Sequence, residues 1–340
     1  MIDLATPRRI ESIDPVDAET FARDVASRYR PIVIRRLVEE WPAVAAARAG
    51  HGALVDYLRP LDGGTPTTVF SAPPEANGRF FYTPDVNGLN FGTQQVTLTR
   101  LLETLVDLAS DPNPPALYAG ATPTAQSMAG FADDNATPFA LPGSEPRIWV
   151  GNATQVATHY DMSHNIACVV AGKRRFTLFP PDQIGNLYVG PVDRTPAGQP
   201  VSMVNLLAPD LDRYPRFARA MEHALVADLD PGDAIFIPSM WWHHVRATGA
   251  LNVLVNYWYL TGADTGPFAA LMHTVYAIRE LPAEERDAWR SWFEHYAFGP
   301  SAPDAVAHLP PRVRGVLGAP SATRDDRIKA YVVNALQRAR

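Results

Sequence analysis

The sequence predicts a mainly β protein with flanking helices, whose core is a double-stranded β-helix, the jelly-roll form of a barrel. From about residue 116 to residue 262, short runs of β-branched and aromatic residues are separated by Gly, Pro or Asp. Earlier segments mix helical and strand patterns, and the segments after residue 262 are helical. With 340 residues, 46% of them hydrophobic, the chain can bury a sizeable core.

The N-terminal part predicts helices and short strands in alternation. Residues 15–29 have a proline near the start and apolar residues at three- and four-residue spacing, which predicts a helix. Residues 31–37 predict a strand, and residues 41–58 predict helical structure whose Ala-rich part ends at Gly50. Short strands are then expected at 67–71 and 79–83, a helix at 97–110 and a strand at 116–119, before a loop-rich segment at 121–146.

The barrel strands are short and end at turn residues. Gly172 and the pair Gly232 and Asp233 predict tight turns. The strands are expected at 147–151, around His159, and at 166–170, 174–179, 224–228, 234–237, 245–248 and 251–258.

The C-terminal part predicts helices at 268–281, at 282–298 and from 321 or 325 to 340. We therefore expect two parts. Residues 1–262 form a jelly-roll domain with an N-terminal elaboration and a core at about 116–262. Residues 263–340 form a helical segment that either caps the barrel or forms a dimer.

Two short segments carry candidate metal ligands. His159 and Asp161 are two residues apart, so an extended chain points both side chains to one side. His243 follows His159 by 84 positions (243 − 159), a separation that several barrel strands span. Two imidazoles and a carboxylate on one face of a metal leave positions open, which is the ligand set of non-haem Fe(II) oxygenases. The pattern predicts an Fe(II) site.

The flanking residues add specificity to this prediction. They read HYD at 159–161, Asn165, LFPPDQ at 178–183, PGD at 231–233, WWHH at 241–244 and VNYWY at 255–259. In this order they resemble the JmjC/cupin-8 family of Fe(II)/2-oxoglutarate oxygenases, most of all its asparaginyl-hydroxylase members. The resemblance covers residues 148–260 well and implies a cupin jelly roll.

The resemblance implies 2-oxoglutarate as cosubstrate, with its distal carboxylate bound by a cation. The family's lysine position holds Arg174 here, and strand alternation aims Arg174 and Lys173 to opposite faces. A guanidinium can pair with a carboxylate through two hydrogen bonds, so Arg174 is the expected substitute. Lys173, displaced by a local bulge, remains the alternative. Tyr118, Asn165 and Asn256 match further residues of the family's site, although such side chains also serve core hydrogen bonding.

The resemblance also implies residues on the substrate side. Trp258 matches a tryptophan beside the substrate groove, and Tyr160 and His164 are expected near it. Val156 departs from the family, which has a threonine there and so one more hydroxyl donor. Val156 and the arginine at 174 favour one alternative, a metal-binding cupin without 2-oxoglutarate turnover that acts as a binding or regulatory module. A further alternative is a cupin enzyme that uses a metal without 2-oxoglutarate.

Charge and composition limit the partners. The net charge of −6 argues against a nucleic-acid partner, because phosphate binding needs a basic surface. The single cysteine, Cys168, excludes an internal disulfide and is compatible with a reducing compartment. The first residues lack a secretory pattern, and no apolar run approaches about 18 residues. We expect a cytoplasmic protein that does not cross a membrane.

These observations together predict an Fe(II)- and 2-oxoglutarate-dependent oxygenase that hydroxylates a protein side chain or a small molecule. Because C-terminal helices form a dimer in the resembling hydroxylase, we also expect a homodimer.

Overall fold

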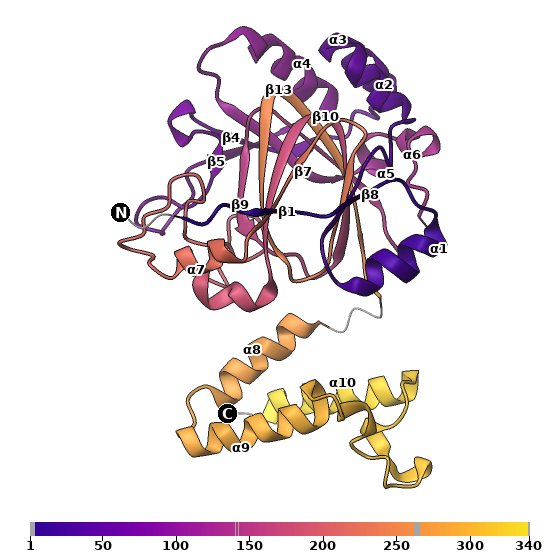
Figure 1. Ribbon diagram of the computed structural model, residues 1–340, viewed down its shortest axis with the longest axis vertical. Coiled ribbons are helices and arrows are strands. Elements are labelled where there is room, and N and C mark those ends of the chain that lie inside the picture. Colours follow the sequence, from indigo (N-terminus) through magenta and orange to yellow (C-terminus); the bar gives the residue numbers. More distant parts are fainter. Residues whose placement is uncertain (1–3, 140, 142, 262–265, 339–340) are drawn as a thin grey trace. The chain divides into compact units, whose positions relative to one another are not determined.

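The protein is described by a computed structural model that covers residues 4–139, 141, 143–261 and 266–338. By the contacts between residues, the chain divides into two units, Met1–Gly262 and Ala263–Arg340. The first unit contains the strands and the second contains helices (Figure 1). The last two residues of the helix predicted to reach residue 340 lie outside the described residues.

The described residues of the first unit form thirteen strands and several short helices (Figure 1). The strands are β1 (Arg8–Arg9), β2 (Ser12–Ile13), β3 (Ile32–Ile34), β4 (Thr67–Ala72), β5 (Arg79–Phe80), β6 (Gly92–Val96), β7 (Ala116–Pro123), β8 (Pro146–Gly151), β9 (Gln155–His159), β10 (His164–Phe179), β11 (Leu225–Leu229), β12 (Ala234–Ile237) and β13 (Trp242–Tyr259). The α-helices are α1 (Ala18–Thr20), α2 (Pro42–Ala49), α3 (His51–Leu58), α4 (Leu98–Asp107), α5 (Thr124–Ser127), α6 (Phe131–Asp134) and α7 (Phe217–Glu222).

Two long bent strands, β10 and β13, belong to both layers of the jelly roll. The first half of β10 pairs with the second half of β13, and this layer continues through β12 and β3 on one side and β8, β7, β4 and β6 on the other. The second half of β10 pairs with the first half of β13, and this layer continues through β11 and β1 and through β9 and β5. The predicted jelly-roll core is confirmed.

The bends explain one difference from the sequence expectations. Separate strands were expected on either side of Gly172, but both belong to β10. Gly172 adopts φ +74°, and shifts of register at Val169 and Ala171 let β10 turn without leaving β13. The two strands expected at 245–248 and 251–258 merge into β13 in the same way, with Gly249 at φ +95°.

The N-terminal helical segments are also less regular than expected. In place of one helix over 15–29, α1 continues into a π-helical turn at Phe21–Val25 and a 3-10 turn at Ala26–Arg28. The helical segment expected over 41–58 is two helices, α2 and α3, because Gly50 has φ +133° and interrupts it.

Alternation along the strands separates two hydrophobic clusters. Ile166, Cys168 and Val170 face one cluster. The helices α2, α3 and α4 also contribute side chains to this cluster, for example Val44 and Leu58. The intervening Ala167 and Val169 face a second cluster that also contains residues of the opposite layer, such as Phe176 and Leu178. The free thiol of Cys168 is therefore buried in a structural cluster, and burial raises its pKa.

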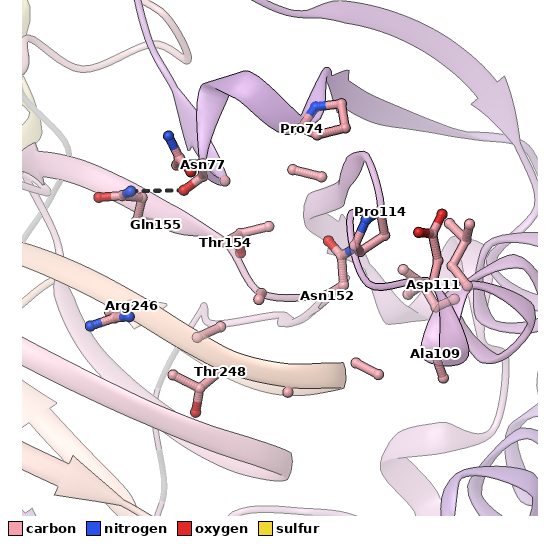
Figure 2. Close-up of a pocket in the computed structure, with 18 of the residues that line it drawn as sticks. Pro74, Asn77, Ala109, Asp111, Pro114, Asn152, Thr154, Gln155, Arg246 and Thr248 are labelled. Atoms are coloured by element: carbon pink, nitrogen blue, oxygen red, sulfur yellow. Dashed lines mark hydrogen bonds between the residues drawn. The ribbon is translucent and has the colours of Figure 1, made fainter.

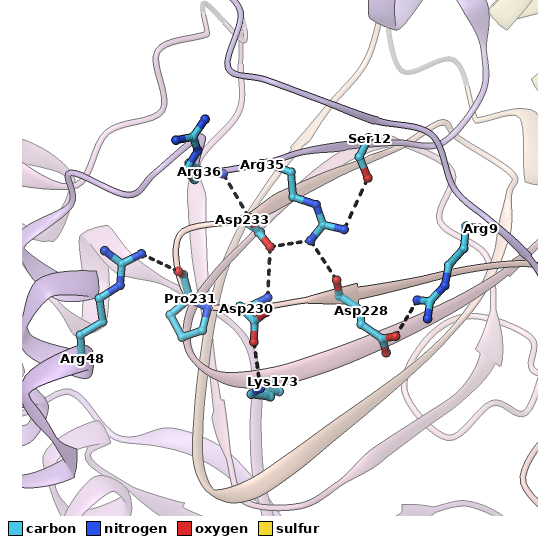
Figure 3. A network of polar contacts seen from close by, with 10 residues as sticks. All are labelled: Arg9, Ser12, Arg35, Arg36, Arg48, Lys173, Asp228, Asp230, Pro231 and Asp233. Carbon is cyan, nitrogen blue, oxygen red and sulfur yellow. Dashed lines mark hydrogen bonds and ion pairs between the residues drawn. The ribbon is translucent and has the colours of Figure 1, made fainter.

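A network of ion pairs and hydrogen bonds ties the N-terminal segment to the sheet (Figure 3). Asp233 lies in the turn between β11 and β12, after Gly232 at φ +104°. Its carboxylate accepts hydrogen bonds from the Arg35 guanidinium (2.7 Å), the Arg36 backbone N–H (3.0 Å) and the Asp230 backbone N–H (3.2 Å). With 10% of its side chain exposed, Asp233 is largely desolvated and depends on these donors.

The second unit consists of α8 (Pro267–Ile278), α9 (Ala283–Phe293) and α10 (Ala322–Arg338), joined by short helical turns. None of the described residues in these three helices is buried. Large apolar side chains are exposed, among them Trp292 (61%), Phe298 (76%) and Tyr331 (77%). This unit has almost no core of its own. In the part of the chain that the structure describes, the helices lack the length and apolar character that crossing a membrane requires.

We predict that Asp233→Ala lowers the free energy of unfolding by about 2 to 3 kcal/mol, because three donors, one of them the partly buried Arg35 guanidinium, lose their acceptor. Asp230→Ala is the matched control in the same turn. Asp230 pairs with Lys173 at 3.3 Å, but both side chains are more than 60% exposed, so we expect a loss below about 1 kcal/mol. Urea unfolding of both variants measures the difference. Equal losses would contradict the role given to the Asp233 network.

Candidate metal centre

The barrel brings the three predicted ligands together. β9 ends at His159, Asp161 follows in the next turn, and His243 lies opposite His159 in the antiparallel pairing of β9 with β13. The His159 Nε2 atom is 4.0 Å from Asp161 Oδ1, and the His243 Nε2 atom is 3.6 Å from Asp161 Oδ2. One potential ligand atom of each residue lies within 4.8 Å of those of the other two. Ligands from two strands and a turn thus converge on one point.

Both imidazoles are oriented by the backbone. The Nδ1 atom of His159 lies 2.9 Å from the carbonyl oxygen of Ala157, and that of His243 lies 3.0 Å from the carbonyl oxygen of Trp241. A carbonyl can only accept, so each Nδ1 carries the proton and each Nε2 lone pair points toward Asp161. Burial lowers the pKa of His243, and the positive charge of a protonated His159 would lower it further. His243 is therefore neutral at pH 7, the form that binds a metal.

Asp161 is held from two sides. The Trp258 indole N–H donates to Asp161 Oδ2 at 3.0 Å, and the Met240 backbone N–H donates to the Asp161 carbonyl oxygen at 2.8 Å. Met240 adopts φ +64°, a left-handed conformation that is unfavourable for a long side chain. The turn before His243 is therefore fastened to the turn that carries Asp161. The donor set and its fixed orientation fit a divalent transition metal with open coordination positions.

A narrow cavity inside the barrel extends from these ligands to Arg174. Its lining includes His159, Asp161 and His243 at one part and Arg174 with Tyr118 at another. Arg174 is 4% exposed, its Nε atom has no hydrogen-bond partner, and no carboxylate within the described residues forms an ion pair with it. Burial lowers the pKa of Arg174 and raises that of Tyr118, whose ring lies close to the guanidinium charge. The cavity therefore contains a buried cation that lacks a counter-ion.

Two asparagines line the same cavity. The Asn256 side-chain amide donates to Asn165 Oδ1 at 3.1 Å, and its Oδ1 accepts from the Trp149 indole N–H at 2.6 Å. Asn165 and Asn256 thus form a buried polar wall beside the metal ligands. Trp149 was not singled out from the sequence, although alternation with the outward-facing Ile148 and Val150 places it on the inner face.

Three residues expected at the site lie elsewhere. Lys173 faces the outer side of the barrel and pairs with Asp230, because strand alternation turns it away from the side of Arg174. Tyr160 points opposite to His159 and packs edge-on against Trp242 in a separate hydrophobic cluster. His164 accepts a hydrogen bond from the Ser239 backbone N–H and is stacked among aromatic rings outside the cavity. The direction in which the strand or turn points each side chain, and not its closeness in sequence to a site residue, decides whether it reaches the cavity.

An outer chamber of about 260 Å³ continues from the metal ligands toward the surface. It shares Tyr118, Trp149, Val156, His159, Asp161 and Trp258 with the inner cavity. The chamber is completed by three phenylalanines, Phe70, Phe80 and Phe91, and by a loop that contains Gln199. These phenylalanines and Gln199 come from segments that sequence reasoning did not connect with the site.

A further cavity, of about 610 Å³, lies at the bend of β13 rather than at the ends that carry His243 and Trp258. Figure 2 shows its lining, which includes Thr154, Asn77 and Arg246. Thr154 thus lines a different cavity from Val156, which borders both the inner cavity and the outer chamber. Thr154 does not supply the hydroxyl that Val156 lacks.

A jelly roll with a cluster of two histidines and an aspartate at the mouth of its inner cavity places the protein in the cupin class of barrels. Comparison with known families is more specific. The profile of the cupin-like domain matches residues 18–265, and the chain belongs to this family, whose members include JmjC-type oxygenases.

Individual relatives are similar over parts of the chain. Lysine-specific demethylase JMJ31 of Arabidopsis thaliana is 36% identical over 117 residues, which are 34% of this chain and 21% of that protein. The bifunctional peptidase and (3S)-lysyl hydroxylase JMJD7 of Homo sapiens is 26% identical over 291 residues, 76% of this chain and 86% of that protein. tRNA wybutosine-synthesizing protein 5 of Mus musculus is 33% identical over 150 residues, 39% of this chain and 44% of that protein. The chain spans only about a fifth of JMJ31, and the names of these relatives cover several activities.

We predict that Trp258→Phe weakens Mn(II) binding about tenfold, because Asp161 loses the N–H that orients its carboxylate. Trp149→Phe removes a similar indole from the same cavity, but its N–H serves Asn256, so we expect less than about a threefold change. Asp161→Ala is expected to abolish binding while the thermal unfolding of the barrel stays close to that of the wild type. Calorimetric titration of Mn(II) measures all three. An equal loss in the two tryptophan variants would show that Trp258 acts only through packing.

Proposed function

We propose that the protein is an Fe(II)- and 2-oxoglutarate-dependent oxygenase that hydroxylates its substrate. The observation that carries this proposal is the buried Arg174, which has no acidic partner among the described residues and lines the same cavity as His159, Asp161 and His243. A buried guanidinium without a counter-ion is strongly unfavourable unless an anion joins it. A dicarboxylate that reaches from Arg174 to the metal ligands would supply a counter-ion for the guanidinium at one end of the cavity and a group that can bind a metal at the other.

The roles of the residues follow from this arrangement. Arg174 binds the distal carboxylate by charge-assisted hydrogen bonds, and the Tyr118 hydroxyl is a further donor at that end. His159, Asp161 and His243 would hold the iron, and the 2-oxo acid end of the cosubstrate would lie beside them. The apolar residues of the wall, such as Phe176 and Leu254, exclude water from the cavity.

Iron held at this centre would supply the redox chemistry that couples two oxidations to the reduction of dioxygen. 2-Oxoglutarate loses carbon dioxide and takes up one oxygen atom as succinate, and the other oxygen atom enters a substrate C–H bond as a hydroxyl group. The protein orients the cosubstrate through Arg174 and places the substrate in the outer chamber. Relatives named as a hydroxylase and a demethylase support this class of reaction.

Val156 favours a second candidate function. It removes one hydroxyl from the cavity wall, where the resembling family carries a threonine. A cupin that binds a metal without 2-oxoglutarate turnover would need no such donor. The buried Arg174 weighs against this alternative, because a cation inside the barrel serves no evident purpose without an anion to bind.

We predict that 2-oxoglutarate, added anaerobically to the Fe(II)-loaded protein, produces a saturable visible charge-transfer band. Arg174→Ala is expected to raise the dissociation constant at least tenfold, or about 1.4 kcal/mol, because a charge-assisted pair is lost. Lys173→Ala is the matched control, since Lys173 lies one residue away but faces outward, and it should leave the constant unchanged. The same anaerobic titration measures the dissociation constant of 2-oxoglutarate for both variants.

Iron binding without any band would favour the metal-binding cupin without 2-oxoglutarate. An unchanged dissociation constant in Arg174→Ala would assign the distal carboxylate to another residue.

We also propose that the protein forms a homodimer through its second unit. The proposal is supported by the unburied helices α8, α9 and α10, whose apolar side chains need a covering surface. A second copy presents the same apolar faces, so a symmetric pair buries both.

Sedimentation velocity tests this proposal. The wild type is expected at twice the mass of the chain, and Tyr331→Asp is expected to shift it to the mass of one chain, because a charge enters the covered surface. Ala330→Asp, on the same helix but on the side away from Ile328, Val332 and Leu336, is the matched control for one added negative charge. A wild-type monomer would contradict the proposal.

A further inference from the structure

The wall of the outer chamber is predominantly aromatic. Its rings come from five strands and one loop, and they are Phe70, Phe80, Phe91, Tyr118, Trp149 and Trp258. The volume of about 260 Å³ is slightly below the range of pockets that enclose drug-sized ligands. The chamber therefore holds one group of a substrate, of about the size of a ring.

The acidic group and the two indoles of the wall are already engaged. Among the lining residues that the structure describes, Asp161 is the carboxylate, and it belongs with His159 to the metal centre. The indole N–H of Trp258 donates to Asp161, and that of Trp149 donates to Asn256. No carboxylate is left for a cation that enters the chamber, so an ammonium group would lose its hydration without gaining an ion pair.

The three phenylalanines form a wall rather than a cage for a cation. The Phe70 and Phe91 ring centroids are 5.1 Å apart, those of Phe80 and Phe91 are 5.4 Å apart, and those of Phe70 and Phe80 are 6.1 Å apart. Rings at these distances fill the space between them with their own contacts. A cation therefore cannot be enclosed among the three rings, whereas an apolar group can pack on the surface that they share.

The shape of the chamber is built into a bulge of β7. The register of β7 with β8 shifts between Ala119 and Thr122, and Ala121 adopts φ +52°. A Cβ atom on Gly120 would lie 2.9 Å from the Trp149 ring, so only glycine lets Trp149 lie against the strand. The Arg147 guanidinium donates to the Ala121 carbonyl oxygen at 3.0 Å and lies 5.8 Å from the Trp258 ring. The bulge thus fixes the position of the aromatic rings that form the wall.

We propose that the outer chamber accepts an uncharged, ring-sized apolar group of the substrate, and that Gln199 determines this preference for a neutral group. The proposal rests on the proposed oxygenase function, for which it names the substrate class. Gln199 also lines the chamber, and its amide is neutral, whereas a carboxylate at this position would offer an ion pair to a cation.

Binding of matched probes to the full chain tests the proposal by calorimetry, both without metal and loaded with Mn(II). The peptide-like probes are N-acetylphenylalaninamide, N-acetylnorleucinamide and N-acetyllysinamide, and the small-molecule probe is indole. We expect the phenylalanine probe or indole to bind at least tenfold more tightly than the lysine probe. Stronger binding of indole would indicate a small-molecule substrate, and stronger binding of the phenylalanine probe would indicate a protein side chain.

Two variants locate the binding. Gln199→Glu is expected to raise the affinity for the lysine probe, relative to the norleucine probe, at least fivefold. Ala197→Trp places a large side chain in the chamber from its exposed loop, and we expect it to lower the affinity for the preferred probe at least tenfold. Val192→Trp adds the same bulk to an exposed position of this loop outside the chamber lining and should leave binding unchanged.

The outcomes separate this inference from the proposed function. Equal or tighter binding of the lysine probe to the wild type, or no binding of a neutral probe at millimolar concentration, overturns the inference. An unchanged ratio in Gln199→Glu overturns the role of Gln199. The charge-transfer band with 2-oxoglutarate is recorded on the same samples. If the band is absent but neutral probes clearly bind more tightly, the proposed oxygenase function is rejected, whereas the inferred selectivity of the chamber for neutral groups stands.

Discussion

The pairing of β9 with β13 is the constraint on which the metal centre depends. His159 and His243 face each other across this ladder, and both imidazoles point into the barrel. A slip of one residue would turn the side chain of His243 to the other face of the strand, away from His159 and Asp161. The bends at Gly172 and Gly249 keep β10 and β13 paired over their whole length, so the register set in one layer is transmitted to the other.

The interior of this barrel contains several polar side chains. Arg174, His243, Asn165 and Asn256 are all buried in the space where a jelly roll without a site would be filled by apolar side chains. Such groups destabilise a fold unless they are paired. The asparagines pair with each other and with Trp149, whereas Arg174 is left for a ligand. The surrounding clusters, with residues such as Phe176 and Ile235, supply the stability that this interior lacks.

Local sequence patterns predicted much of this arrangement, because alternation and turn residues act over a few positions. They predicted the jelly roll and the common side on which His159 and Asp161 lie. They also predicted that Arg174 and Lys173 point to opposite faces of their strand. They failed where the outcome depends on distant contacts. Continuous β10 requires a positive φ at Gly172 together with compensating bulges, which no pattern of hydrophobicity encodes. Phe91 and Gln199 reach the chamber from loops, so their position follows from the fold as a whole.

The orientation of the imidazoles has a consequence for which metal the protein carries. Each ring is fixed by the carbonyl of the residue two positions earlier in the chain, so the ligands are arranged before an ion arrives. Folding therefore cannot distinguish one divalent ion from another. Nitrogen and oxygen donors generally bind Cu(II), Ni(II) and Zn(II) more tightly than Fe(II). Iron at this centre would depend on cellular supply. Where zinc or nickel accumulates, these ions would occupy the site, and the proposed oxygenase activity would be lost although the sequence is unchanged.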